Sequence, residues 1–173
     1  TEDASLTAHG QLTITDPDTG ESSFQAVTVP GDYGTLDIDS SGSWTYTVDN
    51  NLEAVQSLAA GEVLPDSIDV TSYDGTTQTI QITITGTNDG PIVQDTVSLP
   101  ATEDTALTIT EAQLLEYVTD IDGDDLHVEN LRVREGFEHD GTLFDNGDDT
   151  WTFSPAGDFS GPVALAYDVS DGT

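Results

Sequence analysis

Apolar and polar residues alternate along several short segments of the chain. The clearest examples are QLTITD (11–16), SWTYTV (43–48), TIQITITG (79–86) and WTFSP (151–155), which are rich in Thr, Ile, Val and aromatic residues. Because successive side chains of a strand point to opposite faces, this alternation predicts half-buried β-strands. Clusters of Gly and Asp separate the segments at spacings typical of β-sandwiches, so the predicted fold class is all-β.

Two other segments show the spacing of short helices. NLEAVQSLAAG (51–61) carries its leucine and valine residues at helical intervals, which predicts a helical insertion. TEAQLLEYV (110–118) opens with Thr110 and Gln113, which is the sequence pattern of a capping box. We expect both to be brief helical insertions in a chain that is otherwise made of strands.

The chain contains two copies of one plan. In the first half GTL (34–36) is followed by WTY (44–46), and in the second half GTL (141–143) is followed by WTF (151–153). The separation of Thr from Trp is nine residues in both copies, and each pair predicts a hairpin that ends in an aromatic strand. Thr-Glu-Asp, Asp-x-Asp and Asp-Gly-Thr also recur in the same order, which indicates two tandem β-sandwich domains.

The segment TGTNDGPIV (85–93) lies between the two copies. A strand-like pattern ends there, the turn-forming residues Asn-Asp-Gly-Pro follow, and a new apolar run begins. We therefore place the boundary near Gly90, which gives domains 1–90 and 91–173. Each copy has a strand-length segment that the other lacks, so the first domain is expected to lack its first strand and the second its last strand.

The composition narrows the range of partners. The chain has 173 residues, with 34 acidic residues against two arginines and no lysine, and its formal charge is −32. Nucleic acid and anionic membrane surfaces need a basic face, so neither is an expected partner. No apolar run approaches the roughly 20 residues of a membrane span, so membrane insertion is not expected. The absence of cysteine excludes disulfides and thiolate metal sites, whereas cations suit this charge.

The segment VTDIDGDDLHV (118–128) concentrates this charge. Four aspartates and one glycine occupy six consecutive positions: Asp120, Asp122, Gly123, Asp124 and Asp125. An EF-hand loop that began at Asp120 would need glycine at its sixth position and glutamate at its twelfth, but these positions hold Asp125 and Leu131. The segment is therefore not an EF-hand, and a metal bound there must take further ligands from elsewhere in the fold.

Sandwich topology indicates where those ligands lie. Strands run alternately up and down, so the loop after the second strand and the loop before the last strand of the second domain lie at its linker-facing end. The first kink of the first domain faces the same linker. We therefore predict a junction metal site formed by Glu2, Asp3, Asn88, Asp89, Asp120, Asp122 and Asp171.

Further acidic residues occupy matching motifs and are additional candidate ligands. They are Asp16, Asp18 and Asp74 in the first domain and Glu103, Asp104 and Asp124 in the second. Ca²⁺ binds six to eight oxygen atoms and tolerates irregular geometry, whereas Mg²⁺ requires a stricter octahedron. Zn²⁺ prefers histidine and cysteine, and the three histidines are scattered along the sequence. The predicted ion is therefore Ca²⁺.

The longest motifs resemble known bacterial repeats. TEDASLTAHGQLTITDPDTGESSFQAV, YGTLDIDSSGSWTYTVDN and YDGTTQTIQITITGTNDGP resemble a VCBS-type repeat of large bacterial surface proteins. ATEDTALTITEAQLLEYVTDIDGDDLHV and NGDDTWTFSPAGDFSGPVALAYDVSDG resemble the neighbouring bacterial cadherin-like repeat. The resemblance implies immunoglobulin- or cadherin-like extender modules of RTX-type adhesins. Such proteins are secreted by a type I system, act at the bacterial cell surface and are stiffened by calcium between modules.

The resemblance also implies which residues bind the ions. Cadherins place ligands at a first-kink glutamate (here Glu2 and Glu103), at a linker Asn-Asp, at an Asp-x-Asp after the second strand and at an aspartate before the last strand. One motif of the family, an acidic residue before the sixth strand, has no clear counterpart here, and Glu53 and Glu62 are the nearest candidates.

We expect a non-catalytic, calcium-binding structural module that supports cell adhesion and biofilm formation, with calcium ions and adjacent repeats of the same chain as partners. The sequence contains none of the common hydrolase, metalloprotease or phosphate-binding motifs. The alternative is a ligand-binding module that recognises surface polysaccharide or another adhesin molecule. Trp44 and Trp151 could stack on sugars, but their position in alternating strands favours core packing.

Overall fold

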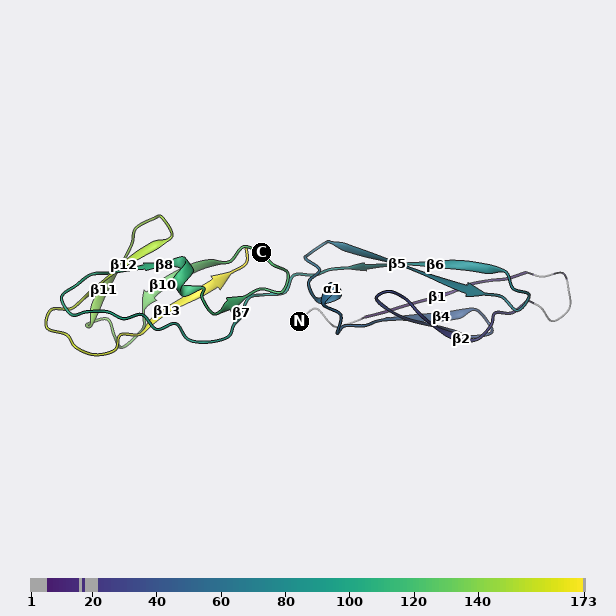
Figure 1. Cartoon of the computed structure of the whole chain (residues 1–173), viewed down its shortest axis with the longest axis horizontal. Helices are drawn as coiled ribbons and strands as arrows, with labels where there is room; N and C mark the ends of the chain where they lie inside the picture. Colours follow the sequence, from purple (N-terminus) through teal and green to yellow (C-terminus); the bar gives the residue numbers. More distant parts are fainter. Residues whose placement is uncertain (1–5, 16, 18–21, 173) are drawn as a thin grey trace. The chain divides into compact units, whose positions relative to one another are not determined.

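A computed structural model describes residues 6–15, 17 and 22–172 of the chain. The chain divides into two units, Thr1–Asp89 and Gly90–Thr173, and each is built from antiparallel strands (Figure 1). Within the described residues each unit has one helix of a single turn, Glu53–Gln56 (α1) or Glu111–Leu114 (α2). The predicted all-β fold class is confirmed.

The described part of the first unit consists of a four-stranded sheet packed against a two-stranded sheet. The four-stranded sheet has the order β1-β4-β3-β2, with strands Thr7–Gln11, Ser43–Val48, Gly34–Ile38 and Val27–Pro30. The other sheet pairs β5 (Val63–Thr71) with β6 (Thr77–Thr85). In β6 the three isoleucines are buried and the residues between them are exposed, as the alternating sequence predicts.

The core of the first unit is formed by apolar residues from both sheets. Leu36 and Tyr46 face each other across the β3–β4 ladder and are 0% exposed. Ile68 and Val70 of β5 belong to the same buried cluster. Burial of such side chains stabilises the fold by roughly 1.5–3 kcal/mol each.

A buried carboxylate lies inside this core. Asp66 on β5 is 3% exposed, and its Oδ2 accepts hydrogen bonds from the Tyr46 hydroxyl at 2.6 Å and from Tyr33 N–H at 3.2 Å. Ser67 N–H donates to Oδ1 at 2.7 Å. Burial by itself raises the pKa of Asp66, but these hydrogen bonds outweigh it and hold the pKa below its usual value. The charged form is therefore the stable one in the folded unit.

The Tyr46 hydroxyl is expected to matter to the stability of the first unit. Replacing Tyr46 with Phe leaves Asp66 buried with one donor fewer, which should lower the free energy of unfolding by about 1–3 kcal/mol. Because the folded pKa of Asp66 is lowered, its contribution is present above the unfolded pKa of about 4 and is lost as the pH falls through the folded pKa. The variant should therefore also unfold at a higher pH during acid titration.

Thermal and acid unfolding of Tyr46→Phe, monitored by circular dichroism, checks this expectation. Tyr73→Phe is the matched control, because Tyr73 is 67% exposed. Equal stability of the two variants at neutral pH would show that the hydrogen bond to Asp66 contributes nothing to the fold.

The second unit is built from three small sheets. One has the order β11-β12-β8 (Gly141–Asp145, Thr150–Pro155, Leu107–Thr110), one pairs β10 (His127–Val133) with β13 (Leu165–Ser170), and one pairs β7 (Ile92–Val93) with β9 (Val118–Thr119). Its buried core consists of Ile109, Leu114, Val128, Trp151 and Phe153. Leu114 comes from α2, so this helix is part of the core.

The repeated hairpin has the same register in both units. Leu36 pairs with Tyr46 in the first, and Leu143 pairs with Phe153 in the second. Both hairpins begin with a glycine that the aromatic ring covers, and a Cβ on Gly141 would lie 2.4 Å from the Phe153 ring. Only glycine leaves room for this close approach. The hairpins predicted from the repeat are therefore confirmed, and the covering aromatic ring explains why each begins with glycine.

One predicted strand is partly wrong. The segment 11–16 was expected to form a strand, but β1 ends at Gln11. Leu12 N–H donates to the Gly42 carbonyl, outside the β1–β4 ladder. Leu12 and Ile14 nevertheless pack against the core, which explains why the segment shows an alternating pattern.

Both helices are shorter than predicted. The helix expected over 51–61 is confined to Glu53–Gln56, where the N-cap residue Leu52 has no side chain able to cap it. The second predicted helix, 110–118, ends at Leu114, and Val118 instead pairs with Val93 in the β7–β9 ladder. The capping box of Thr110 and Gln113 is confirmed.

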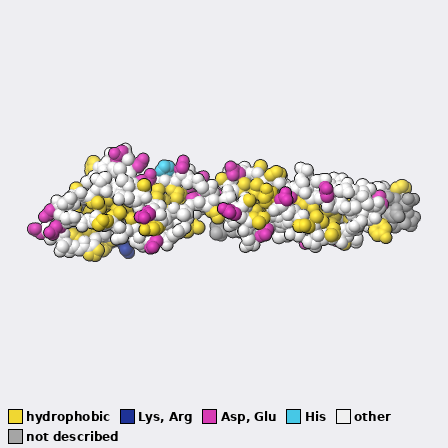
Figure 2. All heavy atoms as spheres, viewed as in Figure 1, with side chains coloured by type: hydrophobic (Ala, Val, Ile, Leu, Met, Phe, Trp, Pro, Cys, Tyr) yellow, Lys and Arg dark blue, Asp and Glu magenta, His cyan; other side chains and the backbone are white. Residues whose placement is uncertain are grey.

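Most of the charge of the protein lies on its surface, and the buried Asp66 is an exception. Figure 2 shows acidic side chains spread over the visible face, with Lys and Arg atoms in very few places. Arg132 lies 3.7 Å from Asp168, but both side chains are more than half exposed, so this ion pair adds little stability. Most of the negative charge is therefore balanced by solvent cations or by ions bound at particular sites.

Candidate metal centre

The acidic loop, residues 120–126, connects β9 to β10. One carboxylate oxygen from each of Asp120, Asp122 and Asp124 lies within 4.8 Å of the others. Among the residues that the structure describes, this is the one group of three or more acidic, histidine or cysteine side chains that meets so closely. The loop folds back on itself because Asp122 N–H donates to Asp120 Oδ1 at 2.9 Å.

A fourth carboxylate lies near the acidic loop. His127 pairs with Ser170 at the end of the β10–β13 ladder, so Asp171 follows β13 beside the point where the loop enters β10. Burial raises the pKa of Asp124, and the charges of Asp120, Asp122, Asp171 and Asp125 raise it further. The neighbouring charges therefore oppose the ionisation of Asp124, and a bound cation would offset this repulsion.

One oxygen of the acidic loop is shielded from solvent. Asp120 Oδ2 has less than 1 Å² of accessible surface and accepts no hydrogen bond from the described residues. Asp122 Oδ1 is also inaccessible to solvent. A buried carboxylate oxygen without a donor is costly, and a metal ion is one of the few groups that can satisfy it.

The donor set fits a hard divalent cation. The group of three offers only carboxylate oxygens, which suit Ca²⁺ and Mg²⁺. The irregular loop favours Ca²⁺, because Mg²⁺ demands a near-ideal octahedron. The nearest histidine in sequence, His127, has its Nδ1 3.6 Å from the Glu111 carboxylate, so Zn²⁺ is not indicated.

Comparison with known protein families agrees with this architecture. Residues 87–173 match the model of a cadherin-like domain, and residues 1–86 match that of a bacterial cadherin-like domain. The chain belongs to the cadherin-like domain family. A comparison with curated proteins gives no match.

Membership in this family bears on the class of function. Cadherin-like domains are generally non-catalytic adhesion or structural modules, and cadherin domains typically bind Ca²⁺. Bacterial cadherin-like domains usually occur on the cell surface or are secreted. Within the described residues, no helix has the length and apolar character needed to cross a membrane.

The junction residues predicted in the first cadherin-like domain are only partly described. Glu2, Asp3, Asp16 and Asp18 lie outside the described residues. Asn88 and Asp89 follow β6, and Asn88 Nδ2 donates to the Asp89 carbonyl at 3.0 Å. Their role as ligands stays a prediction.

The other candidate ligands have different surroundings. Asp74 lies in the β5–β6 turn, where the Ser72 hydroxyl and Thr76 N–H donate to it and lower its pKa. Glu103 and Asp104 are exposed in the loop before β8, and Asp104 accepts a long hydrogen bond of 3.5 Å from Asp158 N–H. None of the three belongs to the group formed by the acidic loop.

The tryptophan of the second cadherin-like domain is a core residue. Trp151 is 8% exposed and belongs to the buried cluster, as its strand position predicts. It also contributes to the wall of an open hollow of about 620 Å³ between β10 and β11. With so little of its ring accessible, Trp151 offers no face on which a sugar could stack.

Two buried or half-buried acidic residues were not identified from the sequence. Asp66 accepts a hydrogen bond from Tyr46 in the first core, and Glu111 accepts one from Val128 N–H at the start of β10, directly after the acidic loop. The one signal for Asp66 is the exchange of Tyr46 for Phe153 between the copies, which indicates a buried polar partner in the first copy only. For Glu111 the one sequence signal is its position at the start of a predicted helix.

Proposed function

We propose that the chain is a calcium-binding structural module, and that the acidic loop and Asp171 form its central ion site. The observation that carries this proposal is the solvent-shielded Asp120 Oδ2, which accepts no hydrogen bond from the described residues, in a loop where Asp120, Asp122 and Asp124 each bring a carboxylate oxygen within 4.8 Å of the others. A divalent cation supplies the missing partner and offsets the repulsion that raises the pKa of Asp124. Extracellular modules of this kind bind calcium with dissociation constants of roughly 0.1–1 mM.

In this proposal the ion also stiffens the linker between the two domains. Asn88 and Asp89 lie two to three residues before Pro91, and Pro91 precedes Ile92, which pairs with Thr119 immediately before Asp120. A ligand from the linker and a ligand from the acidic loop would share one ion, with Glu2 and Asp3 as further ligands from the first domain. Calcium would then favour one arrangement of the domains, whereas repulsion among the carboxylates would leave the linker free to bend.

The wider setting is part of the same proposal. The motifs of the first domain support a VCBS-type repeat, and the acidic, cysteine-free composition suits an extender region of an RTX-type adhesin at the bacterial cell surface. There the module would contribute to cell adhesion and biofilm formation, next to adjacent repeats of the same protein. Recognition of surface polysaccharide or of another adhesin is the rival function, and the buried Trp151 gives it no support.

Distance measurements between the domains test the stiffening. Because the chain has no cysteine, spin labels can be placed on Thr45→Cys and Ser154→Cys, which are exposed strand positions in different domains. Pulsed electron resonance should give a broad distance distribution in EDTA and a narrow one in millimolar Ca²⁺. Mg²⁺ at the same concentration should narrow it less. Equal widths in EDTA and Ca²⁺ would contradict a calcium-stiffened linker.

A further inference from the structure

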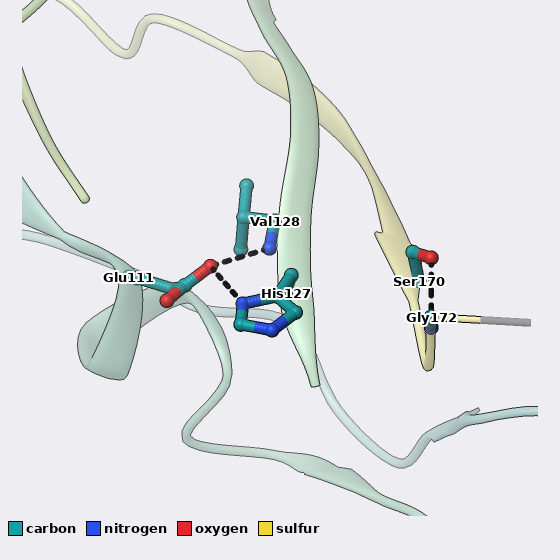
Figure 3. A network of polar contacts seen from close by, with 5 residues as sticks. All are labelled: Glu111, His127, Val128, Ser170 and Gly172. Atoms are coloured by element: carbon teal, nitrogen blue, oxygen red, sulfur yellow. Dashed lines mark hydrogen bonds and ion pairs between the residues drawn. The ribbon is translucent and has the colours of Figure 1, made fainter. Parts of the chain in front are cut away.

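We infer that Glu111 is a positioning residue that holds the acidic loop closed for calcium, an inference that rests on the proposed function. Glu111 Oε1 accepts a hydrogen bond from Val128 N–H at 2.7 Å and lies 3.6 Å from His127 Nδ1. Figure 3 shows its carboxylate between α2 and the start of β10, with Ser170 of β13 on the other side of β10. The contact therefore ties the helix to the strand at the point where the acidic loop ends.

The backbone of Glu111 is itself firmly held. Its N–H donates to the Asp149 carbonyl at 3.0 Å, and its carbonyl accepts from Leu115 N–H at 3.0 Å. The capping box of Thr110 and Gln113 fixes the start of α2, and Leu114 is buried in the core. The carboxylate of Glu111 thus projects from a fixed base.

A second hydrogen bond connects α2 to the sheet that carries the candidate ligands. The Tyr167 hydroxyl on β13 donates to the Leu114 carbonyl at 2.8 Å. Glu111 joins α2 to β10, and Tyr167 joins α2 to β13, so the helix is attached to both strands of that sheet. Beyond β13, Gly172 N–H donates to Ser170 Oγ at 3.1 Å, which forms a tight turn around Asp171 (Figure 3).

This attachment sets the separation of the two ends of the acidic loop. The loop starts after β9, which follows α2 closely in the chain, and it ends at β10, which Glu111 holds against α2. Asp120, Asp122 and Asp124 bring carboxylate oxygens within 4.8 Å of one another, so their like charges push the loop apart. The contact through Glu111 keeps the ends together before the ion binds. Without it, calcium would have to close the loop as well as bind, and part of the binding free energy would be lost.

Glu111 acts here through geometry and not as a ligand. Its Oε1 is committed to Val128 N–H, and the group of meeting carboxylates comprises Asp120, Asp122 and Asp124 without it. Calcium affinity should therefore depend on the length of the Glu111 side chain and not on its charge. A substitution that keeps the charge but shortens the side chain should weaken calcium binding, and one that keeps the reach but removes the charge should not.

Calorimetric titration of the whole chain with CaCl₂, well below the melting temperature, tests this separation. Glu111→Ala and Glu111→Asp should each raise the calcium dissociation constant about 10-fold, the lower end of the usual effect of residues that orient metal ligands. Glu111→Gln retains an oxygen that can accept from Val128 N–H, so it should bind calcium almost as tightly as the control. That control is Glu129→Gln, which removes one exposed charge from the same strand.

The outcomes distinguish a failure of the proposed calcium site from a failure of the positioning role of Glu111. If the wild-type chain binds no calcium, the proposed function fails. If the wild type binds and Glu111→Asp binds equally well, the inference is overturned and the proposed function stands. The inference is also overturned if Glu111→Gln weakens binding as much as Glu111→Asp, or if the variants lower only the melting temperature in EDTA and leave the dissociation constant unchanged. Should Glu111→Ala fail to fold, Glu111→Asp and Glu111→Gln still decide the question.

Discussion

Replacing Asp122 with Asn is expected to lower the melting temperature of the second domain in calcium but not in EDTA. In EDTA the variant should melt at the same temperature as the wild type or higher, because one of the charges that raise the pKa of Asp124 is gone. In calcium it should melt lower, because the neutral amide is a weaker ligand. At a calcium concentration of 100 times the dissociation constant the wild type gains about 2.7 kcal/mol.

The expected fall in the melting temperature of Asp122→Asn follows from the stabilisation that calcium gives the wild type. A domain of 60–100 residues shifts its melting temperature by roughly 4–8 °C per kcal/mol, so losing most of the gain lowers it by about 10–20 °C. Scanning calorimetry of the wild type, Asp122→Asn and the charge control Glu129→Gln measures the difference. An equal fall in EDTA and in calcium would mean that Asp122 supports the fold and does not bind the ion.

The sequence was most informative where local pattern and buried surface agree. The repeated Gly-Thr-Leu and Trp-Thr-aromatic motifs predict the two hairpins, and the structure gives both the same register. Alternation also marks β6, where the side chains of Ile80, Ile82 and Ile84 are buried and the residues between them are exposed. A period of two residues is a direct consequence of strand geometry, so long and regular strands can be recognised without tertiary information.

The sequence failed where tertiary contacts decide the local structure. The apolar spacing of 51–61 predicts a short helical insertion, but only the single turn Glu53–Gln56 forms, and Leu58 reaches the core from beyond its end. Similarly, Val118 continues a helical pattern yet pairs with Val93 as a strand. Short helices are marginal by themselves, so packing overrides their intrinsic preference.

In the candidate site, too, the residues that are close in sequence could be predicted, whereas those that depend on a single tertiary contact could not. Asp120, Asp122 and Asp124 are neighbours in sequence, so their clustering could be predicted from the acidic segment itself. Sandwich topology indicated that Asp171 belongs at the same end of the domain, and its charge does act on Asp124. Glu111 and Asp66 gave no comparable signal, because each owes its role to one contact with a residue distant in the chain.

Removal of calcium is expected to have the largest effect on the wild-type chain. Without the ion, Asp120 Oδ2 stays buried with no donor among the described residues, and the surrounding carboxylates repel one another. Both effects raise the free energy of the native state alone, because an unfolded chain exposes and separates these groups. Calcium should therefore raise the melting temperature of the second domain by about 10–20 °C when it is present at 100 times its dissociation constant. Mg²⁺ should raise it less, since an irregular carboxylate site suits its strict octahedron poorly.

The most direct test of a calcium-binding cadherin-like module is a calcium titration of the wild-type melting temperature that starts from EDTA, with Mg²⁺ titrated in parallel. The account predicts a rise that is specific to calcium, begins at roughly 0.1–1 mM and then continues in proportion to the logarithm of the calcium concentration. A melting temperature that does not change across the calcium titration, or that rises equally with both ions, would contradict it. The acidic loop would then be a solvated turn and not a metal site.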